Sequence, residues 1–239
     1  MNTAKRLIGA VVLAMATSLG ALTASAADLA NLQAGDIIEL NLGNRSSGPG
    51  GEFVASLYSP STTPAANSFV TFCLEKTEYF NPGAPLTVLG ISTYATAGGG
   101  GAVAGKDYIS AQTAWLYTQF RAGALSNYGG SNIANDADAL QNVFWFLENE
   151  ISSVTSGLSA SEATQATTWL AAANAAVAGS WGNTIGNVRV MNLQNANGTV
   201  AQDQLYIAPI PEPEIYAMMV AGLGLMGFVA RRRKQYGDA

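Results

Sequence analysis

One cysteine and the lack of any histidine limit the chemistry that this chain can perform. Without histidine, neither a Ser-His or Cys-His nucleophile system nor a histidine metal site can exist. Cys73 has no second cysteine with which to form a disulfide within the chain. It is therefore either a small buried hydrophobe on a strand, as unpaired cysteines commonly are, or a reactive group. The sequence leaves both interpretations open.

Three later segments combine glutamine with aromatic or apolar residues. They contain Gln112 with Trp115, Gln141 with Trp145, and Gln202 with Gln204. Gln141 and Trp145 would lie one helical turn apart, and core packing, with the glutamine binding a neighbouring backbone, is the simpler explanation for them. Gln202 and Gln204 would share one face of a strand, so their spacing does not distinguish between them.

Together with Phe72-Cys73-Leu74-Glu75, this order of motifs resembles the thioester domains of bacterial surface adhesins. The resemblance implies that the Cys73 sulfur condenses with the carboxamide of a late glutamine and releases ammonia. Of Gln204 and Gln202, we favour Gln204. The resemblance also implies that an amine or hydroxyl on a target surface attacks the thioester and becomes covalently attached. The chain departs from the family in having Leu140 before Gln141 and Phe144 before Trp145. A scaffold that keeps the fold and the cysteine but forms no bond is therefore an alternative.

Two pairs of carboxylates could bind Ca²⁺ through their oxygens. They are Asp136 with Asp138, and Glu148 with Glu150. No glycine-punctuated calcium loop surrounds them, so we interpret them as solvated charges at helix ends and expect neither a metal nor a cofactor. No lysine with serine or threonine follows the glycines at 98–101 into a helix, as a phosphate loop would require.

Short alternating segments predict strands in the first half of the chain and again near its end. The segments are Asp36–Leu42, Glu52–Tyr58, Ser68–Glu75, Leu86–Tyr94, Val188–Leu193 and Thr199–Ile207. Segments rich in glycine, proline and asparagine separate them. Asn195-Ala-Asn-Gly198 is a good hairpin turn between the last two strands.

Between these strand regions the apolar period changes to that of a helix, and three helices are predicted. The first is entered through Asp107 as its N-cap, the second covers Asp136–Ile151, and the third begins at the capping box Ser159-Ala-Ser-Glu162 and ends near Val177. The predicted fold class is α+β: an N-terminal antiparallel β-sheet or barrel, three central helices, and a C-terminal β-hairpin that completes the sheet. A single transmembrane helix follows.

The two ends of the chain predict export. Lys5 and Arg6, the apolar run Leu7–Leu22 and Ala24-Ser25-Ala26 have the form of a signal peptide, so signal peptidase should cleave after Ala26 or Ala27. We therefore divide the chain into a signal peptide at 1–27, an extracellular domain at 28–209 and a C-terminal sorting signal at 210–239.

The C-terminal segment has three parts without a spacer. Pro211-Glu212-Pro213 comes first, the uncharged stretch Ile215–Ala230 predicts a transmembrane helix, and Arg231, Arg232, Arg233 and Lys234 would stay on the cytoplasmic side. This order resembles the PEP-CTERM sorting signal of Gram-negative bacteria. The resemblance implies that an exosortase recognises the Pro-Glu-Pro motif and removes the helix and basic tail. Anchoring to the inner membrane, with the body in the periplasm, would then be transient.

Charge argues against a nucleic-acid partner. Residues 28–203 carry thirteen carboxylates against five cations, a net charge near −8, and offer no basic patch to displace counterions. Only 11% of residues are charged, so small polar side chains must cover the surface. The sequence therefore predicts an exported surface or extracellular matrix protein, not an enzyme, that acts in adhesion or the biofilm. A noncovalent polymer-binding module is the main alternative, and an exopolysaccharide hydrolase is a weaker one.

Overall fold

The computed structural model describes residues 29–45, 50–58, 68–129, 136–209 and 219–226. The predicted signal peptide, Pro211-Glu212-Pro213 and the cations Arg231–Lys234 lie outside the described residues. The predicted transmembrane helix at 215–230 is described only at 219–226, which are helical and exposed. Within the described ranges, no helix combines the length and the apolar character needed to cross a membrane.

Six antiparallel strands form the main sheet, in the order β3-β2-β1-β4-β7-β8. They are β1 (Ile37–Leu42), β2 (Phe53–Leu57), β3 (Ser68–Thr71), β4 (Leu86–Ser92), β7 (Val188–Asn195) and β8 (Val200–Ile207), after a short 3-10 turn, η1 (Leu29–Asn31). The predicted α+β class is confirmed, and β7 and β8 form the expected hairpin beside β4. A second, two-stranded sheet, β5 (Tyr94–Thr96) with β6 (Lys106–Tyr108), was not predicted.

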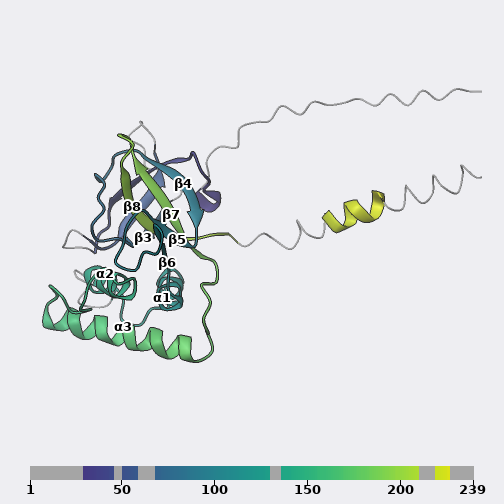
Figure 1. The fold of residues 1–239 in the computed structure, drawn as a ribbon. Helices are drawn as coiled ribbons and strands as arrows, with labels where there is room; N and C mark the ends of the chain where they lie inside the picture. Colours follow the sequence, from purple (N-terminus) through teal and green to yellow (C-terminus); the bar gives the residue numbers. More distant parts are fainter. Residues whose placement is uncertain (1–28, 46–49, 59–67, 130–135, 210–218, 227–239) are drawn as a thin grey trace, which may run out of the picture.

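The two edges of the main sheet meet, so the sheet curls into a small barrel (Figure 1). Beyond the end of β3, the carbonyl of Phe72 accepts a hydrogen bond from Leu205 N at 3.0 Å, and Leu74 N donates to the carbonyl of Asp203 at 3.0 Å. Between these two bonds, Cys73 and Gln204 face each other as an isolated antiparallel bridge. The predicted strand Ser68–Glu75 is thus interrupted after Thr71, and Cys73 lies at the junction that closes the barrel.

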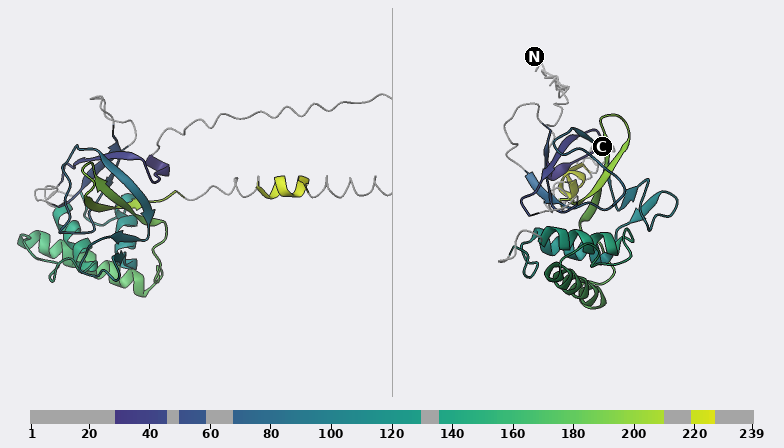
Figure 2. Two further views of the ribbon diagram at one scale, coloured as in Figure 1. Left: turned by 45° about the horizontal axis from the view of Figure 1, so that its top comes forward. Right: turned by 90° about the vertical axis from the view of Figure 1, so that its left-hand side faces the viewer.

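Three helices form a layer at one end of the barrel. They are α1 (Ala111–Arg121), α2 (Asp136–Leu147) and α3 (Ala160–Ala178). Helices α1 and α2 lie between the barrel and α3, which covers their outer side (Figures 1 and 2). One hydrophobic cluster fills the barrel and contains Cys73, and a second lies under the helices. Phe72 and Leu74 belong to the second cluster, so alternate residues around Cys73 join the two cores.

The sequence predicted the N-caps of two helices, and the structure confirms one of them. The prediction of Asp107 as the N-cap of the first helix is wrong, because Asp107 belongs to β6 and Ser110 caps α1 by accepting from Thr113 N. The capping box of α3 is confirmed: Glu162 N donates to Ser159 Oγ at 3.5 Å and Ser159 N to Glu162 Oε2 at 2.6 Å. The second helix ends at Leu147, one turn before the predicted end.

Ser159→Ala should lower the free energy of unfolding by about 1 kcal/mol, because an N-cap hydroxyl satisfies a backbone donor that alanine leaves open. Thr167→Ala, on the exposed middle of α3, is the matched control and should cause no loss. Urea denaturation followed by circular dichroism measures both. Equal losses in the two variants would contradict a specific role for the cap.

Candidate functional site

The Cys73 side chain is fully buried, with both late glutamines in contact with its sulfur. The thiol donates to Gln202 Oε1 at 2.8 Å, and Gln204 Nε2 donates to Sγ at 3.2 Å. These are the two glutamines that their spacing in the sequence does not distinguish. The structure thus brings together the three residues proposed as partners in the thioester bond, Cys73, Gln202 and Gln204.

An irregularity in β8 places the two glutamines around the sulfur. Opposite β7 the register steps from Met191↔Gln204 to Leu193↔Ala201, so β8 has one more residue than β7 over this interval. Such a bulge breaks the regular alternation of side chains along β8, and the side chains of residues 202 and 204 both reach the same sulfur. The Asp203 carboxylate stabilises the bulge by accepting from Leu193 N at 2.7 Å and from Asn192 Nδ2 at 2.7 Å.

Gln141 of α2 holds the backbone of Cys73 from the other side. Its Oε1 accepts from Cys73 N at 3.0 Å and its Nε2 donates to the Cys73 carbonyl at 2.8 Å. The bonds between strands flank the Cys73–Gln204 pair, so the N–H and C=O of Cys73 point away from β8. The Gln141 carboxamide therefore takes the place of a neighbouring strand and fixes the position of Cys73. This is the role that the sequence suggested for Gln141, a buried glutamine that binds a neighbouring backbone.

Trp145 and Gly50 support this clamp. Trp145 lies one turn beyond Gln141 and is mostly buried. A Cβ atom at Gly50 would overlap the Trp145 ring and would lie 3.1 Å from Gln141 Cγ, so only glycine fits there without displacing the clamp. Gly50 lies among several glycines in a loop, and nothing in the sequence marks it out from them.

Gln112 and Trp115, the other predicted pair, do not reach Cys73. Gln112 Nε2 donates to Asn174 Oδ1 on α3 at 3.3 Å, and Trp115 packs on the helix-layer core. Their role in the structure is to join helices.

Two ionisable groups at or near the sulfur, the Cys73 thiol and the Glu75 carboxyl, are held in their neutral forms. Burial, with Glu75 nearby, raises the pKa of the Cys73 thiol, while the Gln204 hydrogen bond opposes the rise, so Cys73 is a thiol at neutral pH. Burial and then the charge of Asp203 raise the pKa of Glu75. Asp203 accepts four hydrogen bonds, whereas Glu75 Oε2 accepts one, from Asp203 N. Glu75 is therefore the partner that holds the proton.

The interpretation of the carboxylate pairs as solvated charges is wrong for two members. Asp136 and Glu148 are buried. Glu148 Oε1 accepts from Ser110 N at 3.2 Å and from Ser110 Oγ at 2.9 Å, and Asp136 accepts from Gly129 N at 2.8 Å. These carboxylates tie loops to helix ends. Among the described residues, no group of cysteine and carboxylate side chains could hold a metal ion.

Glu148 predicts a pH dependence of stability. Burial raises its pKa from 4.5 to about 7, so the folded protein holds this proton more tightly than the unfolded chain. Its stabilising contribution is complete below pH 4.5 and is lost as the pH rises through 7, a loss of up to about 3 kcal/mol. Glu148→Gln should flatten this decline in urea denaturation series between pH 4.5 and 8. A decline as steep as that of the wild type would rule Glu148 out as its source.

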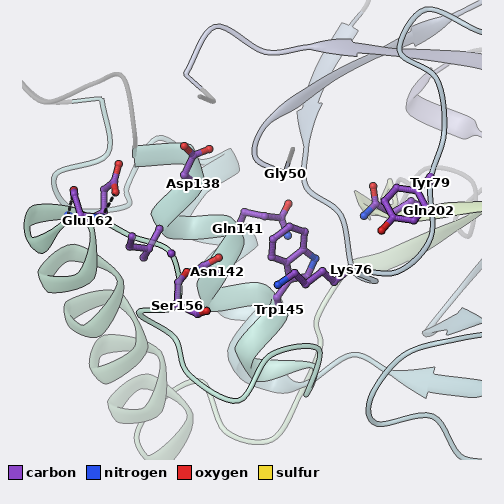
Figure 3. A pocket seen from close by; sticks show the side chains of 13 residues that line it. Gly50, Lys76, Tyr79, Asp138, Gln141, Asn142, Trp145, Ser156, Glu162 and Gln202 are labelled. Atoms are coloured by element: carbon purple, nitrogen blue, oxygen red, sulfur yellow. Dashed lines mark hydrogen bonds between the residues drawn. The ribbon is translucent and has the colours of Figure 1, made fainter. Parts of the chain in front are cut away.

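A pocket of about 610 Å³ lies between α2, the start of α3 and the barrel (Figure 3). Trp145, Lys76 and Tyr79 line the end near the barrel, with the Lys76 ammonium 5.6 Å from the Trp145 ring, whereas Asp138 and Glu162 lie at the far end. Gln141 and Gln202 both line the pocket. It therefore reaches one of the two glutamines that contact the sulfur.

Comparison with known proteins identifies the C-terminal segment. A family model described as the PEP-CTERM protein-sorting motif matches residues 209–234. No curated protein and no solved structure matches the chain. The match supports a PEP-CTERM protein, that is, an exported chain that an exosortase recognises and processes on its way to the cell surface.

Proposed function

We propose that this exosortase-processed protein acts in adhesion or in the biofilm matrix through an internal thioester between Cys73 and Gln204. The observation that carries the proposal is the fully buried thiol, with glutamine amide atoms 2.8 and 3.2 Å from its sulfur. The backbone clamp of Gln141 supports it, because two groups that must react need fixed positions.

Formation of the bond is a condensation. The Cys73 sulfur bonds to Cδ of Gln204, the bond from Cδ to Nε2 breaks, and the thiol proton leaves with the nitrogen as ammonia. Burial excludes water, which would hydrolyse the product. An amine or hydroxyl on exopolysaccharide or on another cell surface then attacks the carbonyl and releases the Cys73 thiol. Each molecule reacts once and stays attached, so the protein is proposed as a single-use acyl donor and not as an enzyme.

Gln204 is the better acyl donor of the two glutamines. Its side chain is fully buried, yet its Oε1 has no hydrogen-bond partner among the described residues, which is costly for an amide oxygen. A thioester carbonyl is a weaker acceptor and carries no N–H groups, so condensation relieves this cost. Gln202, by contrast, uses both ends of its amide: Oε1 accepts from Cys73 and Nε2 donates to the Glu75 carbonyl.

Intact mass of the exported, processed protein tests the proposal. The expected mass is one ammonia below that of the sequence, with no titratable thiol. Methylamine should restore the thiol and add one methylamine, and the Cys73→Ala protein should show neither the deficit nor the reaction. A protein of full mass whose thiol titrates after unfolding would overturn the thioester.

The pocket favours a second candidate, a noncovalent polymer-binding module. Trp145 and Tyr79 offer aromatic surfaces, and Asn142 and Ser159 offer polar groups, the mixture found in ligand sites. In that case Trp145→Ala would abolish retention of the protein on the exopolysaccharide, whereas Cys73→Ala would leave retention unchanged. For the thioester, Cys73→Ala would abolish attachment that resists denaturant.

A further inference from the structure

Gln202 separates the pocket from the sulfur. Of the two glutamines that touch Cys73 Sγ, it is the one that lines the pocket, and it is 6% exposed. Cys73 and Gln204 are both fully buried and are not part of the pocket lining. A nucleophile that enters the pocket therefore meets the Gln202 side chain before the atoms of the proposed bond.

Three hydrogen bonds hold this part of the chain closed. Gln202 Oε1 accepts from the Cys73 thiol, and its Nε2 donates to the carbonyl of Glu75. The Gln202 carbonyl also accepts from Gln204 Nε2 at 3.3 Å. The side chain thus bridges β8 and the segment after Cys73, across the closing junction of the barrel.

Formation of the thioester would loosen this closure. Condensation consumes the thiol proton and removes the nitrogen of Gln204. The hydrogen bonds from the Cys73 thiol to Gln202 Oε1 and from Gln204 Nε2 to the Gln202 carbonyl then lose their donors. The bond from Gln202 Nε2 to the Glu75 carbonyl remains. An amide oxygen without a donor gains from turning toward solvent or toward a ligand in the pocket. The Gln202 side chain would therefore be easier to displace after the thioester has formed than before.

We propose that Gln202 is the gate of the thioester: its side chain closes the pocket off from the Cys73–Gln204 bond, and the pocket is the route by which amines reach that bond. This inference rests on the proposed function and assigns Gln202 a role distinct from that of the acyl donor. Attack requires the Gln202 side chain to swing away. Shortening it should therefore expose the carbonyl, whereas an apolar side chain of similar length should keep the passage filled.

The rate of reaction with methylamine tests the gate in the exported, processed protein. Gln202→Ala should retain the deficit of one ammonia and react with methylamine roughly tenfold faster than the wild type, because the side chain no longer adds to the barrier. Hydrolysis in buffer alone should accelerate as well. Gln202→Met, which fills the same space, should react at close to the wild-type rate, and Gln204→Ala should show full mass throughout.

A large side chain introduced into the pocket tests whether amines reach the thioester through it. Ser156→Trp places a large ring on a pocket-lining residue and should slow the methylamine reaction by about tenfold. Ser152→Trp, in the same loop but outside the pocket lining, is the matched control and should react at the wild-type rate.

The outcomes separate the two proposals. Full mass in the wild type overturns the thioester and the gate together. A deficit in Gln204→Ala that is absent from Gln202→Ala makes Gln202 the acyl donor, so the gate fails while the thioester stands. If Gln202→Ala has the deficit but reacts at the wild-type rate, the gate alone is overturned. Gln202→Asn, shorter by one methylene, provides the same comparison if the alanine variant fails to fold.

Discussion

Opening the thioester with methylamine will lower the free energy of unfolding by about 5 kcal/mol, the value that chain entropy gives for a cross-link enclosing a loop of this length. Cys73 and Gln204 are 131 residues apart in sequence, and the bond would join them across the closing junction of the barrel. The intact cross-link limits the conformations of the unfolded chain, whereas the methylamine adduct does not. The measurement is urea denaturation of the exported protein before and after treatment.

Cys73→Ala is the control for this experiment, because it cannot form the cross-link and should show the same denaturation midpoint with and without methylamine. Equal midpoints for treated and untreated wild type would mean that no cross-link was present. Separate mass measurement on the same samples shows whether methylamine was incorporated.

Gln141→Leu should destabilise the protein by about 2 to 6 kcal/mol, because it leaves the buried N–H and C=O of Cys73 without partners at about 1 to 3 kcal/mol each. Leucine keeps most of the volume of glutamine, so the loss is attributable to the two hydrogen bonds and not to a cavity. The variant should also form less thioester, since the cysteine backbone is no longer fixed against Gln204.

Gln112→Leu is the matched control. It makes the same change on α1, where the glutamine amide donates to Asn174 in an exposed position, and its effect should stay within about 0.5 kcal/mol. Both variants are measured by urea denaturation, with the ammonia deficit read from intact mass. A loss for Gln112→Leu as large as that for Gln141→Leu would show that the Cys73 clamp has no special role.

Local signals in the sequence predicted much of the fold. The hairpin of β7 and β8 follows from alternating residues around Asn195-Ala-Asn-Gly198, where Gly198 has a φ of 83° that favours glycine. The capping box at Ser159 and Glu162 fixed the start of α3 correctly. These patterns depend on neighbours in sequence. The meeting of Cys73 with Gln202 and Gln204 was anticipated only through the resemblance to thioester domains.

Features that depend on distant contacts were missed. Asp107 looked like a helix cap, but its segment pairs with Tyr94–Thr96 as β6, and Ser110 caps the helix instead. Glu148 looked solvated, yet the loop before α1 covers it. The bulge in β8 had one local sign: Asp203 lies between two glutamines in the middle of a strand, where aspartate is disfavoured unless its carboxylate replaces missing ladder bonds. Gly50 had none.

The closing strand also determines when this protein can fold during export. Strand β8 pairs with β7 and with the residues that follow β3, so the barrel cannot close before the residues up to Ile207 are available to pair. The matched sorting motif begins at residue 209, two residues after the end of β8. The strand that completes the fold and the segment that directs sorting are therefore neighbours in the sequence.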